Sequence, residues 1–446
     1  MTAYTTTSSK CLSAPRRIAS PAAKCLPNEA RETNAVSLRE QIEREIRQRG
    51  PIPFSRYMQI CLYDPSHGYY SANAEQFGKA GDFYTSSDVH AVFGRLLARQ
   101  FDEIWQALDR PAKIEILELG PGRGLFARDV LDWSNKKFHD FFAALTYTLQ
   151  ETSPALRAKL QETLREHLDA GRAHVGAGAL TCPAGRSPAA ADIHRSLPPD
   201  APLIVFANEF FDALPVEILS TNGKLHIAFE NNSLRETWLP PLAEELEFLD
   251  RYGVHPEPRE RIDVDDDDRI EVPILAQDWI RQIARSIERG LLVIVDYGYT
   301  RHQQLAGRYR GTLMAYRRHY ASPDPYQAPG EQDLTAHVNF TALAAVCEQA
   351  GMQCEKLLTQ SQFLMGIGET NQFADAFEDC RIPQERAKVA LQLKHLVTPI
   401  GMGETFQVLT ASRGIDPARI AALSGLRFGS SSQFSASDAK TPATHN

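Results

Sequence analysis

The chain has 446 residues, a formal net charge of -8 and 23% charged residues, a composition that is ordinary for a globular enzyme. The acidic balance argues against a general nucleic-acid-binding protein, because such proteins carry a basic field. The seven cysteines include no C-x-x-C pair, and an odd number of them argues against a zinc site or a disulfide framework. No apolar run reaches the roughly 18 residues that a membrane span requires.

Residues 1–36 are expected to form a disordered arm, because they are rich in Ser, Thr, Ala and Pro. The same stretch contains basic residues and no acid before Glu29, which is also typical of a mitochondrial transit peptide. The disordered arm is favoured slightly. If residues 1–35 are a transit peptide, the protein belongs in the mitochondrial matrix, whereas a bacterial protein of this kind belongs in the cytoplasm.

Residues 37–112 are predicted to form a helical cover. Ser37 and Glu40 have the spacing of a capping box, so the first helix begins there. A second helix is expected over residues 54–63, and apolar residues at helical spacing predict a long amphipathic helix over 93–105.

Residues 113–411 alternate between strand and helix patterns. Strands are expected at residues 114–119, 145–150, 203–208 and 291–296, and helices at 123–133, 154–168, 340–350 and 385–396. Alternating units of this kind predict an α/β fold with a doubly wound, mostly parallel sheet. Residues 220–285 interrupt the pattern and are expected to be an insertion, and residues 412–446 are expected to be a largely disordered tail.

The stretch after the first of these strands reads E-x-G-x-G-x-G, with Glu118, Gly120, Gly122 and Gly124. A strand, a tight glycine turn and a helix start are the elements that bring a nucleotide-like ligand against bare backbone. The dinucleotide form of the motif requires a small residue at position 125, where this chain has Leu125. The spacing therefore favours S-adenosylmethionine (SAM), which has no pyrophosphate. A plain turn remains the alternative.

Glu151 ends the next predicted strand, where a carboxylate can accept both hydroxyls of a ribose. Its distance along the chain from the glycine turn exceeds the usual spacing of about 20 residues. The segment 136–144 explains the difference. The two acids and the glycine turn together predict a nucleoside site.

The stretch ANEFFDALP follows a central strand and contains Asn208, Glu209 and Asp212. Such sheets place ligands and chemistry at the carboxyl ends of their strands. Two carboxylates can hold a guanidinium and orient its nitrogens. The alternative is that Asp212 caps a helix and Glu209 pairs with an arginine, and the spacing favours neither reading.

Two later stretches have compositions that are unusual for segments with a purely structural role. The motif DYGY, residues 296–299, ends another strand at the same edge of the sheet, and residues 311–340 are expected to be a long loop that acts as a lid or binding surface. His319 and His337 in this loop are possible bases, although a structural hydrogen-bonded role is the safer interpretation for each. No metal-ligand spacing is visible, so no metal site is expected.

These motifs resemble those of the MidA-like SAM-dependent methyltransferases, a family that includes a mitochondrial complex I assembly factor. The resemblance covers roughly residues 38–410. It is carried, in order, by GPIPFSRYM, YDPSHGYY, GDFYTSS, ELGPGRG, NEFFDALPV, VDYGY, GTLMAYRRH, PGEQDLTAHVNF and IGMGETF.

The resemblance implies a class I methyltransferase fold, which is Rossmann-like with a seven-stranded, mostly parallel sheet. It implies SAM as methyl donor and a protein arginine as acceptor, symmetrically dimethylated, in the assembly of a respiratory complex. The resemblance also implies roles for residues at matching positions. Gly120, Gly122 and Gly124 line the SAM loop together with Glu118, and Glu151 holds the ribose. Gly81 and Asp82 fold over the pocket, and Glu209 and Asp212 lie on the acceptor side.

The chain also departs from the family pattern. A short strand with a tryptophan is expected between Leu168 and Pro198 but no tryptophan is present, STNGKLHIAF follows Leu219, and Asn339 stands where an acid is common. These departures put the substrate in question. A non-catalytic assembly or chaperone protein and a small-molecule methyltransferase therefore stay as alternatives, and the residues give no indication of oligomeric state.

Overall fold

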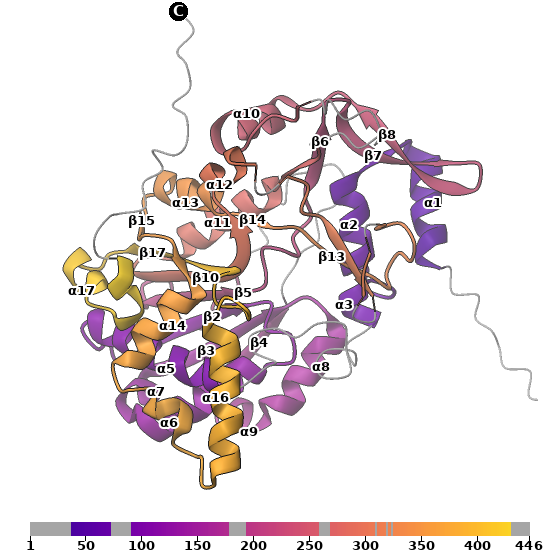
Figure 1. The fold of residues 1–446 in the computed structure, drawn as a ribbon. Helices are drawn as coiled ribbons and strands as arrows, with labels where there is room; N and C mark the ends of the chain where they lie inside the picture. The colour runs from indigo at the N-terminus through magenta and orange to yellow at the C-terminus, as the bar shows by residue number, and fades with distance from the viewer. Residues whose placement is uncertain are drawn as a thin grey trace, which may run out of the picture. The chain divides into compact units, whose positions relative to one another are not determined.

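The structure is a computed structural model that describes residues 37–72, 91–177, 193–257, 268–307, 310–317, 320–322 and 324–429 (Figure 1). The expected N-terminal arm lies outside these ranges, as do Gly81, Asp82 and His319. Every helix within the ranges is too short or too polar to cross a lipid bilayer.

The main sheet has seven strands along its path, in the order β15-β17-β10-β5-β2-β3-β4. These strands are β2 (Ile114–Leu119), β3 (Leu145–Glu151), β4 (Ala173–Ala177), β5 (Leu203–Asn208), β10 (Gly290–Tyr299), β15 (Gln353–Cys354) and β17 (Phe406–Arg413). Strands β2, β3, β4, β5 and β10 run parallel, and β17 runs antiparallel to β10 and β15. Two short strands, β14 (Val338–Asn339) and β16 (Leu358–Thr359), extend the sheet beside β10 and β17. The expected third strand is present as β4.

Helices cover both faces of this sheet. The core on one face contains α5 (Ala91–Ala107), α6 (Leu125–Lys137) and α14 (Gln360–Glu369), and the core on the other contains α11 (Ile274–Ser286) and α13 (Phe340–Gln349). Strand β2 contributes to both, because alternate side chains of a strand point to opposite faces. Ile114 and Ile116 pack in the first core, and Leu117 and Leu119 pack in the second. All six residues of β2 are buried, as expected for a parallel strand covered on both sides.

Further helices complete this part of the chain, namely α7 (His139–Ala144), α8 (Pro154–Thr163), α9 (Arg165–Asp169), α12 (Arg301–Leu305), α15 (Ala374–Phe377) and α16 (Pro383–Val397). The single helix expected over residues 154–168 is thus two helices, α8 and α9. Helix α8 begins where Ser153 accepts a hydrogen bond from the Leu156 N–H, with Pro154 in the first turn.

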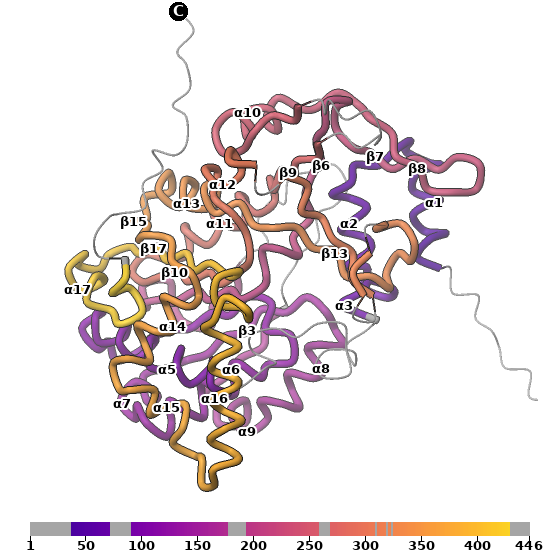
Figure 2. Tube along the Cα trace, in the orientation of Figure 1, coloured from indigo at the N-terminus to yellow at the C-terminus, as the bar shows by residue number. Residues whose placement is uncertain are grey.

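The N-terminal helices pack on a second sheet. Helices α1 (Leu38–Arg49), α2 (Phe54–Tyr63) and α3 (Tyr69–Ala72) precede the main sheet, and the second sheet contains β1 (Ile52–Pro53), β6 (Glu217–Ser220), β7 (Gly223–Glu230), β8 (Ser233–Leu239) and β9 (Ile270–Val272). Figure 2 shows α1 and α2 beside β7 and β8, although these segments are far apart in the sequence. Phe54 and Met58 of α2 share a core with Leu225 and Ile227 of β7.

The expected insertion divides between two parts of the structure. Its strands and α10 (Ala243–Tyr252) belong to the second sheet and its surroundings, whereas α11 covers the main sheet. Helix α11 therefore does not belong to the insertion, although its residues fall within the expected range. The sequence reveals the amphipathic pattern of this helix but not the partner on which it packs.

Part of the expected long loop is a small three-stranded sheet. It consists of β11 (Met314–Arg317), β12 (Tyr320–Ser322) and β13 (Asp333–Thr335), in the order β12-β11-β13. Ala315 and Leu334 are buried in the same core as Tyr57 of α2. The segment is therefore held against the N-terminal helices.

Residues 413–429 contain regular structure, although the sequence predicts a tail from residue 412. Helix α17 (Pro417–Ala421) and the 3-10 helix η1 (Ser424–Gly429) follow β17. Ile420, Leu423 and Leu426 are buried, and the Gly425 N–H donates to the Gln100 side chain over 2.8 Å. Residues 417–429 thus differ from the expectation, because three apolar side chains at regular spacing find a surface on α5 and α14.

Candidate active site

The three glycines after β2 all have positive φ, with 63° at Gly120, 54° at Gly122 and 76° at Gly124. This region favours glycine because other residues strain the backbone there. A Cβ on Gly124 would lie 2.6 Å from Leu160 Cδ2, whereas a Cβ on Gly122 would meet no heavy atom of the described residues within 4 Å. Gly124 is therefore required for packing. Gly122 leaves the backbone open on its outer side, where a ligand can approach it.

Glu151 joins this loop to the end of β3. Its carboxylate accepts a hydrogen bond from the Ser153 N–H over 2.8 Å and also faces the backbone N–H groups of Thr152 and Gly122. Burial raises the pKa of Glu151 to about 7, and these hydrogen bonds oppose the rise. The sequence-predicted partners Gly122 and Glu151 are thus neighbours in space.

Glu118 lies near the carboxyl end of β2, which pairs with β3. It is buried in β2, and the hydroxyl of Tyr147 in β3 donates to its Oε2 over 2.8 Å. Burial raises the pKa of Glu118 to about 8, and the charge of Glu151 adds to the rise. Glu118 is therefore a buried acid close to Glu151.

The loop after β5 begins with a residue in an uncommon conformation. Glu209 has a φ of 50°, which is rare for a residue with a side chain and costs backbone energy. Its N–H donates to the Val295 carbonyl over 3.0 Å, and its Oε1 accepts from the Asn208 side chain over 3.1 Å. Strained residues of this kind cluster at functional sites.

Asp296, from the motif DYGY in β10, fixes the rest of this loop. Its Oδ2 accepts backbone hydrogen bonds from Phe210, Phe211 and Asp212, over 3.2, 3.0 and 3.3 Å. The side chain is fully buried, and burial, followed by the charges of Asp212 and Glu209, raises its pKa well above the ordinary range. Asp296 thus fixes the backbone of the loop that carries Glu209 and Asp212.

Asp212 is buried beside Tyr297, whose hydroxyl donates to Asp212 Oδ2. The other carboxylate oxygen, Oδ1, is buried and accepts no hydrogen bond of good geometry from the described residues, although the backbone N–H groups of Asp212 and Ala213 lie close to the carboxylate. Burial raises the pKa of Asp212 to about 6, and the bond from Tyr297 opposes this rise. All residues between Asp212 and β6 are described and none of them begins a helix, so Asp212 is not a helix cap.

Residues from α2 and α3 connect the two halves of the site. The Tyr63 hydroxyl donates to the Ala213 carbonyl over 2.9 Å, and the Tyr70 carbonyl accepts from the Ser153 hydroxyl over 2.8 Å. The Tyr70 hydroxyl donates to Asp333 Oδ1 over 2.9 Å. These contacts tie the N-terminal segment to both predicted acid sites and to β13.

His337 follows β13 and lies against Tyr297, with ring centroids 5.3 Å apart and an edge-to-face arrangement. Burial lowers its pKa, so the ring is neutral at pH 7. Asn339, which departs from the family pattern, caps α13 by accepting from the Ala342 N–H over 3.0 Å. The departure at position 339 thus supports a helix end.

The sequence predicts that the glycine loop, Glu151, Glu209 and Asp212 meet at one edge of the sheet, and the structure places them there. The sequence patterns do not single out four further residues whose side chains line this region, Tyr63, Tyr70, Tyr297 and Asp333. Their signal is present in the motifs YDPSHGYY, VDYGY and PGEQDLTAHVNF, but the pairing of these motifs depends on tertiary structure.

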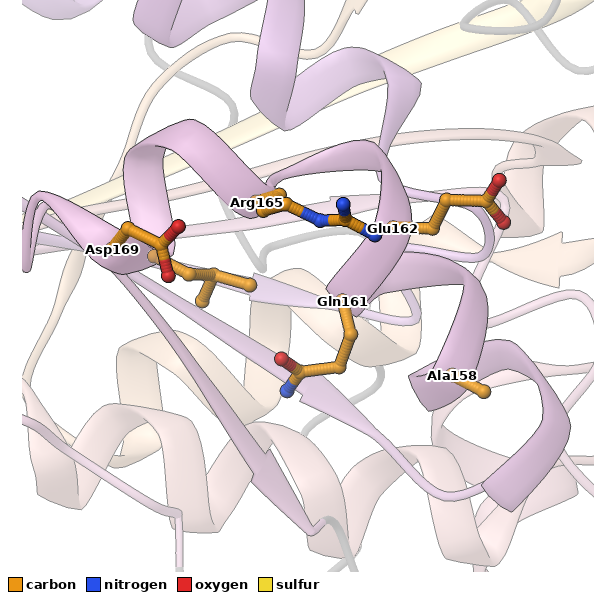
Figure 3. A pocket seen from close by; sticks show the side chains of 6 residues that line it. Ala158, Gln161, Glu162, Arg165 and Asp169 are labelled. Carbon is orange, nitrogen blue, oxygen red and sulfur yellow. The ribbon is translucent and has the colours of Figure 1, made fainter.

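The outer side of α8 and α9 has a separate surface hollow (Figure 3). It is lined by Ala158, Gln161, Glu162, Arg165, Leu168 and Asp169. None of the site residues described above lines it. Within the described ranges, no group of three or more His, Cys, Asp and Glu side chains is arranged to hold a metal ion.

The arrangement fits SAM. The chain order of the strands reverses between the neighbours β2 and β5, and open sheets bind ligands at such a switch point. The open backbone at Gly122 and the buried carboxylate of Glu151 lie after β2 and β3, and the acids Glu209 and Asp212 lie after β5. Fold and site together are those of a class I SAM-dependent methyltransferase.

Comparison with known proteins gives the family. The chain belongs to the family described as "Putative S-adenosyl-L-methionine-dependent methyltransferase", whose model matches residues 96–358. It is 29% identical over 405 residues to the mitochondrial protein arginine methyltransferase NDUFAF7 homolog of Drosophila melanogaster, covering 87% of this chain and 88% of the relative. It is 30% identical over 403 residues to the mitochondrial protein arginine methyltransferase NDUFAF7 of Danio rerio, covering 86% and 88%.

A solved structure is similar over almost the whole chain. A protein from Burkholderia thailandensis, crystallised with S-adenosyl-homocysteine, has a TM-score of 0.69 and 29% identity, and the match covers 88% of this chain and 95% of that one. The predicted family, the class I fold and SAM as methyl donor are thereby confirmed. The protein is a SAM-dependent methyltransferase.

Proposed function

We propose that the protein transfers a methyl group from SAM to a guanidinium nitrogen of an arginine in another protein. The observation that carries the proposal is Asp212, a buried acid at the switch point of the sheet, whose Oδ1 accepts no hydrogen bond of good geometry from the part of the chain that the structure describes. The relatives described as protein arginine methyltransferases support the same acceptor.

On the donor side, the backbone of Gly120, Gly122 and Gly124 lies against SAM, and Glu151 accepts hydrogen bonds from the ribose hydroxyls. Gly81 and Asp82 are assigned to this side on the family resemblance alone. SAM supplies a methyl group on a positively charged sulfur. Glu118 supports the loop from within β2, where its bond to Tyr147 joins two strands.

On the acceptor side, Glu209 and Asp212 hold the guanidinium. Arginine has a pKa above 12, so it is a poor nucleophile until its charge is compensated or a proton leaves. The pKa of Asp212, raised by burial to about 6, leaves this group ionised at neutral pH. Its free oxygen accepts an N–H of the guanidinium, which orients the nitrogens and balances the positive charge.

The family resemblance extends the proposal to symmetric dimethylation and to assembly of a respiratory complex. The relatives are mitochondrial proteins by name, so residues 1–35 are proposed as a transit peptide if the chain comes from a eukaryote, and a bacterial protein acts in the cytoplasm. An import assay with and without residues 1–35 tests the compartment.

The function is tested with purified protein, labelled SAM and a lysate of its own organism, followed by mass spectrometry of labelled proteins. We expect label on arginine. Glu209→Gln and Asp212→Asn should retain SAM binding by calorimetry and lose transfer, whereas the exposed control Asp250→Asn should behave as wild type. Label on a small molecule would favour a small-molecule methyltransferase, and no label with intact SAM binding would favour an assembly protein.

A further inference from the structure

A third carboxylate lies near the acceptor side. Asp333 in β13 is only 5% exposed and accepts a hydrogen bond from the Tyr70 hydroxyl. Three residues further along, the Ala336 N–H donates to the backbone carbonyl of Asp212 over 2.9 Å. Strand β13 therefore brings Asp333 into the neighbourhood of Asp212 from a distant part of the chain.

The same tyrosines face both of these acids. Burial raises the pKa values of Tyr63, Tyr70 and Tyr316, and the charges of Asp333 and Asp212 raise all three further. Such charge effects act over short distances inside a protein. The rings of Tyr63 and Tyr70 lie 5.4 Å apart, so they form a continuous aromatic surface near the two carboxylates.

The negative charge of Asp212 is not compensated by a positively charged side chain among the described residues. The groups that meet the Asp212 carboxylate among the described residues are the Tyr297 hydroxyl and backbone N–H groups, all of them neutral, and its buried Oδ1 accepts no hydrogen bond of good geometry from those residues. A buried carboxylate without a compensating positive charge is costly, and a cation that enters the site lowers this cost.

We infer that Asp333 is a specificity-determining residue, which together with Asp212 forms a two-sided binding site for the planar guanidinium of the acceptor arginine. The inference rests on the proposed function. A guanidinium has five N–H donors in a fixed plane and can reach acids on two sides, whereas a lysine ammonium is a compact point charge. The flat cation also packs well on tyrosine rings.

Binding is measured with protein saturated with S-adenosyl-homocysteine, by calorimetric titration of acetyl-arginine amide and acetyl-lysine amide. The wild type should bind the arginine derivative about tenfold or more tightly than the lysine derivative, the size expected for a charged hydrogen bond. Asp333→Asn should lose this preference, and Asp333→Glu should restore part of it. The control Asp324→Asn, in the same loop segment between β12 and β13, should retain it.

Two results would overturn the inference. One is an unchanged arginine preference in Asp333→Asn, and the other is weaker binding of S-adenosyl-homocysteine in that variant, which would place Asp333 on the donor side. Thermal melting of each variant shows whether it is folded. Tyr70→Phe is a second variant, which removes the hydroxyl that donates to Asp333 and leaves the Asp333 carboxylate in place. Failure of the proposed function is distinguishable, because it would appear as absence of label on arginine in the wild type.

Discussion

The backbone N–H of Gly122 faces the carboxylate of Glu151, so the loop after β2 and the end of β3 form one continuous surface. The open side of Gly122 and the buried acid beside it belong to different βα units. A ligand that contacts one of them is therefore within reach of the other.

Gly122→Ala is expected to weaken SAM binding by about tenfold or more, because a methyl group would occupy the open face of the loop. Gly171→Ala is a matched control. Gly122 and Gly171 have φ values of 54° and 65°, and at neither position would an added Cβ lie within 4 Å of a heavy atom in the described part of the chain. Both variants should lose similar stability, about 1 kcal/mol, since the backbone strain is alike. Calorimetry with SAM checks the affinity, and equal affinities in the two variants would contradict the site.

Glu151→Gln is expected to weaken SAM binding by about ten- to a hundredfold, because hydrogen bonds from the ribose would lose a charged acceptor. The comparison is Glu162→Gln in α8, whose side chain is 68% exposed. Titration of SAM and of S-adenosyl-homocysteine measures the effect. Competition with adenosine and with methionine separates the two ends of SAM. If Glu151→Gln weakens the binding of methionine but leaves the binding of adenosine as in the wild type, Glu151 does not hold the ribose.

The parallel part of the main sheet and the grouping of the central site residues follow from local sequence patterns. Strand and helix patterns alternate along the chain and predict parallel strands, and the carboxyl ends of parallel strands lie at one edge of a sheet. Because Gly122, Glu151 and Asp212 each follow or end such a strand, their grouping at that edge is predictable from the amino-acid sequence.

The remaining features depend on contacts between distant segments. Asp333 reaches the site only because β13 packs on α2, and no local pattern encodes that pairing. The second sheet pairs β1 with β7, and four strands of the main sheet, β2 to β5, lie between them in the sequence. The helices after position 412 are not predicted for a similar reason. The composition there is rich in Ser and Gly, and only the tertiary structure shows that Ile420, Leu423 and Leu426 are buried.

Tyr297→Phe is expected to lower kcat by about tenfold or more with SAM affinity unchanged, because Asp212 loses the hydroxyl that positions it. It should also change the pH profile. The hydrogen bond from Tyr297 lowers the pKa of Asp212, so its removal raises that pKa, and the acid limb of kcat/KM moves to higher pH.

The matched control is Tyr326→Phe, which removes a hydroxyl bonded to Glu236 over 2.8 Å. Its pH profile should overlay that of the wild type. An unshifted profile in Tyr297→Phe would show that Tyr297 has only a structural role.

The unfolding free energy of the ligand-free protein is expected to fall as pH rises. Burial raises the pKa of Glu118 to about 8 and that of Glu151 to about 7, above the ordinary value of 4.5 in each case. Between the ordinary and raised values the folded protein holds protons that the unfolded chain has released. Each group therefore contributes a loss of about 1.4 kcal/mol per pH unit in that window, and its stabilisation is complete only below the ordinary value.

Urea unfolding between about pH 5 and pH 7 measures this dependence. In Glu118→Gln the slope should become shallower by the equivalent of one proton, whereas Glu162→Gln should keep the wild-type slope. An identical slope in Glu118→Gln would mean that Glu118 is ionised in the folded protein throughout this range.

Strand β17 pairs with β10 along most of its length, from Gly290 opposite Arg413 to Tyr297 opposite Phe406. During translation, the edge of β10 that carries Asp296 and Tyr297 therefore stays open until the ribosome has released Arg413. Open strand edges recruit other chains. A nascent chain therefore carries an unpaired β10 edge until β17 docks, and that edge is open to association with other chains.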